Sequence, residues 1–283
     1  MRNSGLMWHG KSVYRCARRQ LANFSKPIRG EPVTTPSFAS MTVDRDDVNE
    51  VNDWLARREE WHDPAVVCRY EEEFAHWNGS EHAFAFMGGR VALSACLDAL
   101  DLQPGDEVIL PGYTCVVVPN AIKYADLLPV YCDIELETFG LDASSFRSRI
   151  TSRTRAVILQ HFYGLVCRDY EEILDIARQH HIRVIEDCAH ATGAEYRGVK
   201  VGNRGDVGFY SSEQSKSFNT VQGGVAISNN NEISERLHEF YVAATEPDQE
   251  WIQRQLINVK LNFYTYRHKW RGILADVAHW RYG

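Results

Sequence analysis

Short apolar runs alternate with amphipathic segments through the middle of the chain, and this alternation is the strongest structural signal in the sequence. Seven runs have the length and apolar content of β-strands: Ala83–Met87, Glu107–Leu110, Pro129–Asp133, Ala156–Phe162, Arg183–Asp187, Val207–Ser211 and Gly224–Ser228. Helical periodicity separates several of them and follows the last: Val91–Leu102, Val117–Ala125, Tyr170–His180 and Glu232–Ala244. Strands that alternate with helices predict a mostly parallel seven-stranded sheet covered on both faces, a three-layer α/β/α architecture.

The segments that flank this core have different patterns. Helical periodicity begins at Val43 and returns in Tyr70–Trp77, where Asn78-Gly79 is a typical helix end. Residues 1–30 contain seven basic and no acidic side chains, and we expect a disordered or loosely docked extension, with a targeting segment or a basic arm as the alternatives. Residues 251–283 are rich in Trp, Tyr, Arg and Lys and mostly helical in pattern. We therefore divide the chain into an extension (1–42), a large domain (43–245) and a helical C-terminal segment (246–283).

Composition narrows the class of protein. The formal net charge of -7 argues against a nucleic-acid binder, which usually has a basic footprint. No apolar stretch approaches the ~18 residues that a membrane span needs. The seven cysteines form no CxxC pair, which favours reduced, mostly buried thiols in a cytoplasmic protein. The adjacent His180 and His181 lack a matched cysteine pair, so we expect no metal site.

Ligands of open parallel sheets bind at the carboxyl ends of the strands, and two strand ends carry residues suited to anions or polar pockets. The first strand ends in Gly88-Gly89-Arg90, directly before a helix start. Such a turn directs backbone N–H groups and the helix dipole toward an anion, and Arg90 adds a charged donor. The same glycines also suit a plain tight turn. Gln160–Gly164, after the fourth strand, could line a pocket or simply plug a loop.

The fifth predicted strand ends in an acidic pair, Glu186-Asp187, followed by His190. A carboxylate at the end of an apolar strand is costly unless a cation or hydrogen bonds accompany it. A protonated pyridine nitrogen would be such a partner, and a metal ion or a helix cap would satisfy it equally well. His190 lies close enough in the chain to share a site with Asp187, or to be an ordinary polar residue at a helix start.

Lys216 is the fourth candidate, in the loop Ser211–Lys216 after the sixth predicted strand. Most loop lysines are solvated, but this one follows three serine hydroxyls able to hold a phosphate, and no other lysine occurs between Lys200 and Lys260. A lysine amine forms Schiff bases when its surroundings lower its pKa. The neighbourhood therefore favours a chemical role.

Glycine turn, carboxylate and lysine follow one another in the order of a fold-type I pyridoxal phosphate enzyme. At this point the sequence closely resembles one family, the DegT/DnrJ/EryC1/StrS sugar aminotransferases, from about Val67 to His238. The matching segments are YEEEFAHWNGSEHAFAFMGGRVAL, PGDEVILPGYTCVVVPNAI, LPVYCDIELETFGLD, HFYG, VIEDCAHATGAEYRG, GDVGFYSSEQSK and GGVAIS. The resemblance identifies 43–245 as the pyridoxal-phosphate-binding large domain of such an enzyme.

The resemblance also implies a role for each matched residue. Lys216 would form the internal aldimine and later move the proton between the substrate Cα and the cofactor C4′. Asp187 would bind the pyridinium nitrogen, which keeps the ring protonated and able to accept electrons. His190 matches the position near the ring hydroxyl. The phosphate-binding positions match Gly89, Arg90 and Ser211.

Several positions depart from the family pattern. Arg90 stands where the family has threonine, and Glu213 where it usually has histidine. Cys115 stands where an aromatic residue stacks on the cofactor ring, so stacking would need Tyr113 or Phe162. The family also has a smaller second domain, which we expect here in truncated or remodelled form. Asn262 is the nearest candidate for a Gly-x-Asn region that the family contributes across a dimer interface.

The resemblance implies an aminotransferase that moves an amine from an amino acid, with glutamate expected, to a nucleotide-linked keto sugar in surface-polysaccharide or secondary-metabolite biosynthesis. It implies a homodimer with no nucleic-acid or membrane partner. Lys216 favours this activity over the family's dehydratase branch, where histidine replaces the lysine. The alternative is a truncated, catalytically weak protein that keeps the cofactor fold for binding or regulation. A Rossmann-type nucleotide binder is disfavoured because no G-x-G-x-x-G follows the first strand.

Overall fold

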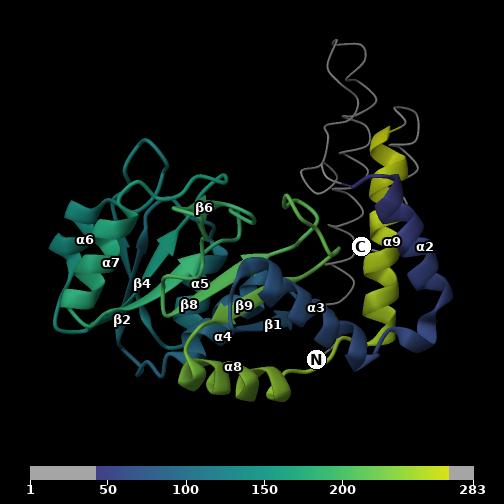
Figure 1. Ribbon diagram of the computed structural model, residues 1–283, viewed down its shortest axis with the longest axis horizontal. Helices are drawn as coiled ribbons and strands as arrows, with labels where there is room; N and C mark the ends of the chain where they lie inside the picture. Colours follow the sequence, from purple (N-terminus) through teal and green to yellow (C-terminus); the bar gives the residue numbers. More distant parts are fainter. Residues whose placement is uncertain (1–42, 268–283) are drawn as a thin grey trace, which may run out of the picture.

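The computed structural model describes residues 43–267 and contains a seven-stranded mixed sheet flanked by helices (Figure 1). The strands of this sheet are β1 (His82–Phe86), β2 (Glu107–Pro111), β3 (Leu128–Cys132), β4 (Thr154–Gln160), β5 (Arg183–Asp187), β8 (Val207–Ser211) and β9 (Gly224–Ser228). Their order is β1-β9-β8-β5-β4-β2-β3. The pairs β1–β9 and β8–β9 are antiparallel, and the other four pairs are parallel. The predicted fold class is confirmed.

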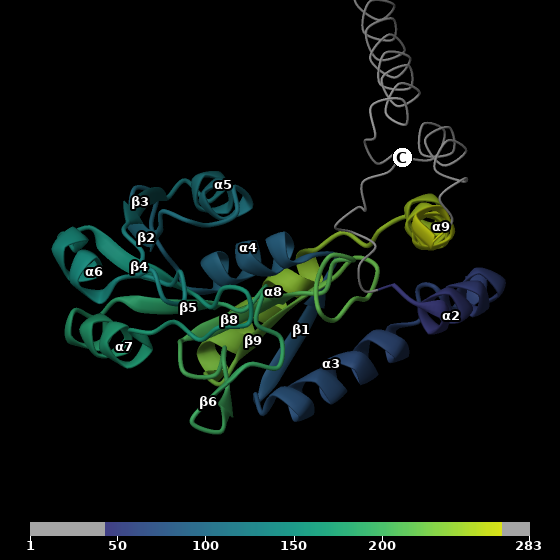
Figure 2. The ribbon, with the colours of Figure 1, turned by 90° about the horizontal axis from the view of Figure 1, so that it is seen from above.

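Helices cover both faces of the sheet, so its central strands are buried on both sides, as all five residues of β2, β8 and β9 show (Figure 2). One face packs against α4 (Gly89–Ala99), α5 (Val117–Tyr124) and α8 (Asn231–Ala243). The other face packs against α6 (Ala143–Arg149) and α7 (Tyr170–Gln179). Toward β1 and β9 this second face is covered by α3 (Pro64–Asn78).

Local sequence signals fix the helix ends. Asp63 caps α3 by accepting a hydrogen bond from the Ala65 N–H, and Pro64 occupies the first helical position. Gly79 ends the same helix with φ 82°, a left-handed conformation that glycine adopts without strain. The helix α2 (Arg45–Ala56) begins at a capping box formed by Asp44 and Asp47.

Two helices lie beside one another away from the sheet. The helix α9 (Gln249–Arg267) packs along α2, which lies near the start of the described chain (Figures 1 and 2). A short 3₁₀ turn, η3 (Arg58–Glu60), follows α2. The predicted extension, residues 1–42, lies outside the described residues, as does the end of the predicted C-terminal segment. The division of the chain at 245 stays a prediction. Among the helices of residues 43–267, none is both long and apolar enough to span a bilayer.

The structure differs from the predicted elements mainly in its shortest pieces. Helix α6 and the hairpin β6 (Glu195–Tyr196) and β7 (Val199–Lys200) were absent from the prediction because two- to seven-residue elements carry too little periodicity. The predicted strand Ala156–Phe162 also ends earlier, because β4 stops at Gln160. The chain turns there through Tyr163 and Gly164, which have φ values of 55° and 80°.

Candidate active site

The carboxyl ends of β2, β4, β5 and β8 surround a cavity of about 90 Å³. All six residues predicted for the site line it, although they come from three separate parts of the chain: Gly89, Arg90, Asp187, His190, Ser211 and Lys216. Parallel strands bring this about because their carboxyl ends meet at one edge of the sheet. The structure therefore places the predicted residues together, and their individual roles remain proposals.

The glycine turn is held in place by close backbone packing. A Cβ atom on Gly89 would lie 2.7 Å from the Cβ of Ser211, and one on Gly224 would lie 2.4 Å from the carbonyl carbon of Gly88. Only glycine fits at either position. Gly88 is the N-cap of α4 and supplies no side-chain cap, so the first N–H groups of the helix are left for another acceptor. With the Ser211 hydroxyl beside it, this end of α4 suits a phosphate.

Asp187 ends β5 and points toward the α4 side of the sheet. It is only 5% exposed, and the Ala189 N–H donates to its Oδ1 at 3.0 Å. Burial raises the pKa of this carboxyl to about 6, although that hydrogen bond and the charge of Lys216 oppose the rise. A carboxylate buried this deeply with so little hydrogen bonding favours a cationic partner.

His190 forms the wall next to Asp187. Its ring stacks on Phe162, with 4.8 Å between the ring centroids and 24° between the planes. Burial lowers the pKa of the imidazole, and the positive charge of Lys216 lowers it further by a smaller amount. His190 is therefore neutral at pH 7, able to give or accept one hydrogen bond at the cavity surface.

Lys216 lies half-buried in the loop between β8 and β9. Backbone hydrogen bonds close this loop: Ser212 N–H to Gly223 O and Thr220 N–H to Ser212 O, both at 2.9 Å. The lysine charge acts on the pKa values of both Asp187 and His190, which places the ammonium in the electrostatic reach of each. A lysine that lines the same cavity as a buried carboxylate and a neutral imidazole suits Schiff-base and proton-transfer chemistry.

Asn262, the candidate for a residue contributed by a partner, contacts the lysine loop of its own chain. Its Nδ2 donates to Gln214 Oε1 at 2.9 Å, and both side chains are buried. Helix α9 thereby supports the loop that carries Lys216.

The departures from the family pattern also fall at the cavity. Cys115 and Arg90 line the cavity, and both residues are exposed to solvent. Glu213 accepts a hydrogen bond from the Ser215 N–H in the lysine loop. Of the two aromatic residues expected to replace the stacking ring, Phe162 belongs to the cavity wall. Tyr113 contacts Phe162 but does not line the cavity, with 5.1 Å between the two ring centroids.

An aromatic rim, defined here as Tyr113, Phe139, Phe162 and Tyr163, extends outward from the cavity wall. Phe162 contacts Tyr163 at 4.1 Å between centroids, and Phe139 contacts Tyr113 at 6.0 Å and Tyr163 at 6.3 Å. Tyr163 is 59% exposed, and its hydroxyl lies 3.0 Å from that of Tyr113. Phe139 and Tyr163 both have positive φ, 61° and 55°, which is strained for aromatic residues.

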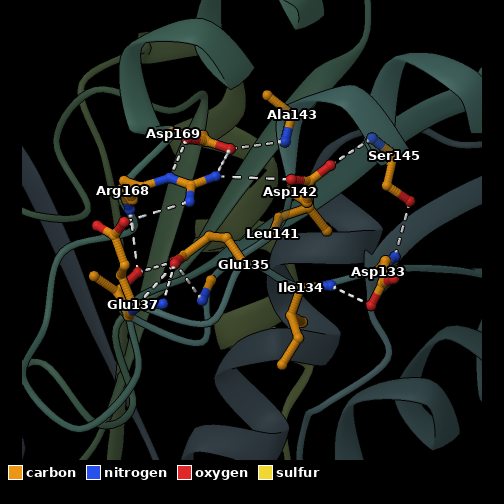
Figure 3. Close-up of polar contacts among 12 residues, drawn as sticks. Asp133, Ile134, Glu135, Glu137, Leu141, Asp142, Ala143, Ser145, Arg168 and Asp169 are labelled. Atoms are coloured by element: carbon orange, nitrogen blue, oxygen red, sulfur yellow. Dashed lines mark hydrogen bonds and ion pairs between the residues drawn. The ribbon is translucent and has the colours of Figure 1, made fainter.

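A polar network holds the loop that carries Phe139 (Figure 3). The buried Glu135 accepts hydrogen bonds from the backbone N–H groups of Glu137, Thr138 and Gly140. Arg168 pairs with Asp169 through two nitrogens at 2.7 and 2.9 Å, and its guanidinium also lies within 4 Å of Asp142 and Glu137. These contacts join the loop before α6 to the start of α7 and so fix the rim.

Sequence reasoning missed several residues that shape the site. Gln160 was seen only as part of a polar strand end, yet its amide accepts from Thr114 and donates to Tyr113 O, which secures the loop after β2. His161 and Glu186 are buried and hydrogen-bonded to each other, and His161 also lines the cavity. The sequence signal for Glu186 is an acidic residue directly before Asp187 on the same strand. Because side chains alternate along a strand, Glu186 is expected on the opposite face of the sheet from Asp187.

Comparison with known proteins places this site in a family. The profile of the DegT/DnrJ/EryC1/StrS aminotransferase family matches residues 42–264. GDP-perosamine synthase of Caulobacter vibrioides is 36% identical over 185 residues, 65% of this chain and 50% of that protein. The chain spans about half the length of the curated relatives it matches.

Solved structures agree with this placement. An aminotransferase from Psychrobacter cryohalolentis superposes with a TM-score of 0.66 at 30% identity, covering 70% of this chain and 50% of that one. An E. coli GDP-4-keto-6-deoxy-D-mannose-3-dehydratase with bound hydrated PLP superposes with a TM-score of 0.65 at 25% identity, covering 72% and 54%. The fold, the convergence of the predicted residues and the match over residues 42–264 show that the chain belongs to the DegT/DnrJ/EryC1/StrS aminotransferase family.

Proposed function

We propose that this protein is a pyridoxal-phosphate-dependent aminotransferase that moves the amine of an amino acid, glutamate foremost, to the keto group of a nucleotide-linked sugar. The observation that carries the proposal is the placement of Lys216, Asp187 and the α4 N-terminus around one cavity. Membership of an aminotransferase family supports the reaction class. GDP-perosamine synthases among the relatives support a nucleotide sugar as acceptor.

The residues present fit the cofactor at three points. The buried carboxylate of Asp187 suits a protonated pyridine nitrogen, because a positive partner removes the cost of burying its charge. The α4 N-terminus, with Gly89, Arg90 and Ser211, suits the phosphate. Phe162 and His190 supply a ring wall where Cys115 replaces the usual aromatic residue.

Pyridoxal phosphate, when bound, supplies an electron sink that stabilises negative charge at the substrate Cα. The protein's own contribution is to hold and move a proton. With the cofactor bound, the Lys216 amine would carry the proton between the Cα of the substrate and the C4′ position of the cofactor, and Asp187 would keep the ring nitrogen protonated. Lys216 stands where the dehydratase branch of the family has histidine, which supports amine transfer over dehydration.

The aromatic rim supports a sugar acceptor. Tyr163 and Tyr113 present exposed rings and hydroxyl groups next to Phe162 of the cavity wall, an arrangement that suits a ring bearing both C–H and O–H groups. Arg90, exposed at the same cavity, provides a cation for phosphate oxygens. We propose that the enzyme acts as a cytoplasmic homodimer in surface-polysaccharide or secondary-metabolite biosynthesis, as the resemblance implies.

The visible spectrum of the purified protein tests cofactor binding. The wild type with added pyridoxal phosphate should show the absorbance band of a lysine Schiff base, and borohydride should bleach it. The Lys216→Ala variant should lack the band, while Lys123→Ala, a change at an exposed lysine on α5, should keep it. A band that persists in Lys216→Ala would contradict the assignment of the lysine.

Addition of an amino donor separates an active enzyme from a silent one. Glutamate should convert the bound cofactor to its amine form. A parallel measurement with glutamine tests a second amino acid as donor. A protein that shows the Schiff-base band but no spectral change with either donor would instead support a binding or regulatory role.

A further inference from the structure

Glu186 is a buried carboxylate that the proposed reaction does not use. It precedes Asp187 on β5, so its side chain points to the opposite face of the sheet, toward α7. It is fully buried at 0% exposure. Burial alone would raise the pKa of Glu186, but hydrogen bonds from His161, Tyr170 and the backbone outweigh it, so the pKa lies below the usual value. The carboxylate is therefore charged at neutral pH.

Five hydrogen bonds hold this charge, and they come from three separate segments. The Tyr170 hydroxyl on α7 donates at 2.6 Å, and His161 Nε2, in the loop after β4, lies at 3.0 Å. Three backbone N–H groups in the loop before β8 complete the set, from Gly202 at 2.8 Å, Arg204 at 2.8 Å and Gly205 at 2.6 Å. Such bonds to a charged acceptor are among the strongest in proteins.

The hydrogen bonds of His161 define its tautomer. The Cys167 N–H donates to Nδ1 at 3.2 Å, so Nδ1 carries no proton and Nε2–H donates to Glu186. The backbone N–H of the same histidine donates to the carbonyl oxygen of Asp187 at 3.0 Å. His161 thus connects Glu186 on one side of the strand with the main chain of Asp187.

A metal site is the other reading of this cluster, because ligand atoms of His161, Glu186 and Cys188 lie within 4.8 Å of one another. Within residues 43–267, however, both oxygens of Glu186 already accept N–H or O–H donors. A cation would have to displace them. Hydrogen bonding accounts for the buried charge without one.

We propose that Glu186 and His161 are positioning residues that fix Asp187 against the ring nitrogen of the cofactor. Asp187 has only two side-chain torsions, so the placement of its backbone decides where its carboxylate points. The main chain at Asp187 is held by the β4 and β8 neighbours, by His161 N–H and by the anchored Glu186 before it. Loosening Glu186 would let the carboxylate drift, and its charge-assisted contact would weaken.

The inference rests on cofactor binding as proposed above, and a double-mutant cycle tests it. We expect Glu186→Gln to weaken pyridoxal phosphate binding about tenfold in a fluorescence titration, and to change the visible circular dichroism of the bound cofactor. In an Asp187→Asn background the same change should have little further effect, because the residue it positions is already altered. Glu107→Gln is the matched control: Glu107 is another buried, hydrogen-bonded carboxylate, at the start of β2.

Two further measurements keep the test decisive. If Glu186→Gln does not fold, Tyr170→Phe serves as a milder variant, because it removes one of the five donors to Glu186. It should weaken pyridoxal phosphate binding about threefold, since the other four hydrogen bonds remain. In the cofactor-free protein, nitrogen NMR should show His161 with its proton on Nε2. The inference would be overturned if Glu186→Gln and Tyr170→Phe kept cofactor affinity and dichroism within twofold of the wild type. It would also be overturned if the effects of Glu186→Gln and Asp187→Asn were fully additive, or if His161 carried its proton on Nδ1.

Failure of the proposed function has a different signature. If the wild type binds the cofactor but transfers no amine, and Glu186→Gln weakens that binding, the aminotransferase proposal is refuted and the positioning role stands. A wild type that binds no cofactor would refute both.

Discussion

Replacing Asp187 with asparagine should stabilise the cofactor-free protein at neutral pH. Burial raises the pKa of this carboxyl from 3.8 to about 6, against the opposing effects of the Ala189 N–H and Lys216. Between these values the folded state keeps a proton that the unfolded chain has released, so the free energy of unfolding falls as pH rises. The shift corresponds to a cost below about 1 kcal/mol at pH 4 that grows to about 3 kcal/mol above pH 7.

Urea unfolding of cofactor-free wild type and Asp187→Asn, followed by circular dichroism at pH 4, 5.5 and 7.5, measures this cost. The asparagine oxygen can still accept from the Ala189 N–H, so the variant differs chiefly in charge. We expect the variant to be more stable by about 3 kcal/mol at pH 7.5 and nearly equal to the wild type at pH 4. A gap that does not grow with pH, or a less stable variant at pH 7.5, would refute the reasoning.

Glu107→Gln provides a control of opposite sign. Hydrogen bonding from Thr151 and the charge of Arg153 outweigh burial and lower the pKa of Glu107. Its contribution to stability is therefore present above the unfolded pKa and is lost as pH falls through the folded value. The variant should be less stable than the wild type at pH 7.5, and the difference should shrink in acid.

Three further predictions concern the walls of the site. Gly224→Ala puts a methyl group 2.4 Å from the Gly88 backbone and should lower the free energy of unfolding by ~1–3 kcal/mol; unchanged urea curves would contradict the packing. Arg168→Lys removes the two-pronged pair with Asp169 at a part-exposed site, so calorimetry should show only a small loss of stability, with the cofactor spectrum unchanged. Tyr163→Ala should raise the KM for the sugar acceptor about tenfold with little change in the free energy of unfolding; an unchanged KM would exclude the aromatic rim from acceptor binding.

The sequence by itself determined the seven strands of the sheet and the order of the main helices. This was possible because two-sided burial gives strands such as Val207–Ser211 a continuous apolar pattern, and each helix between strands has a clear period. The sequence also singled out Asp187, because a carboxylate at the end of an apolar strand is costly without a partner, and Lys216, because it follows three serine hydroxyls able to hold a phosphate. The resemblance to one family added roles that these patterns alone left open.

Only the tertiary structure decided how those residues are supported. Glu186 and Asp187 are neighbours in the chain but face opposite sides of the sheet, and the partners of Glu186 come from α7, the loop after β4 and the loop before β8. The aromatic rim likewise joins Tyr113, Phe139 and Tyr163 across three loops. Periodicity reports which face a side chain occupies, whereas the choice of partner depends on crossover connections that bring distant segments together at one edge of the sheet.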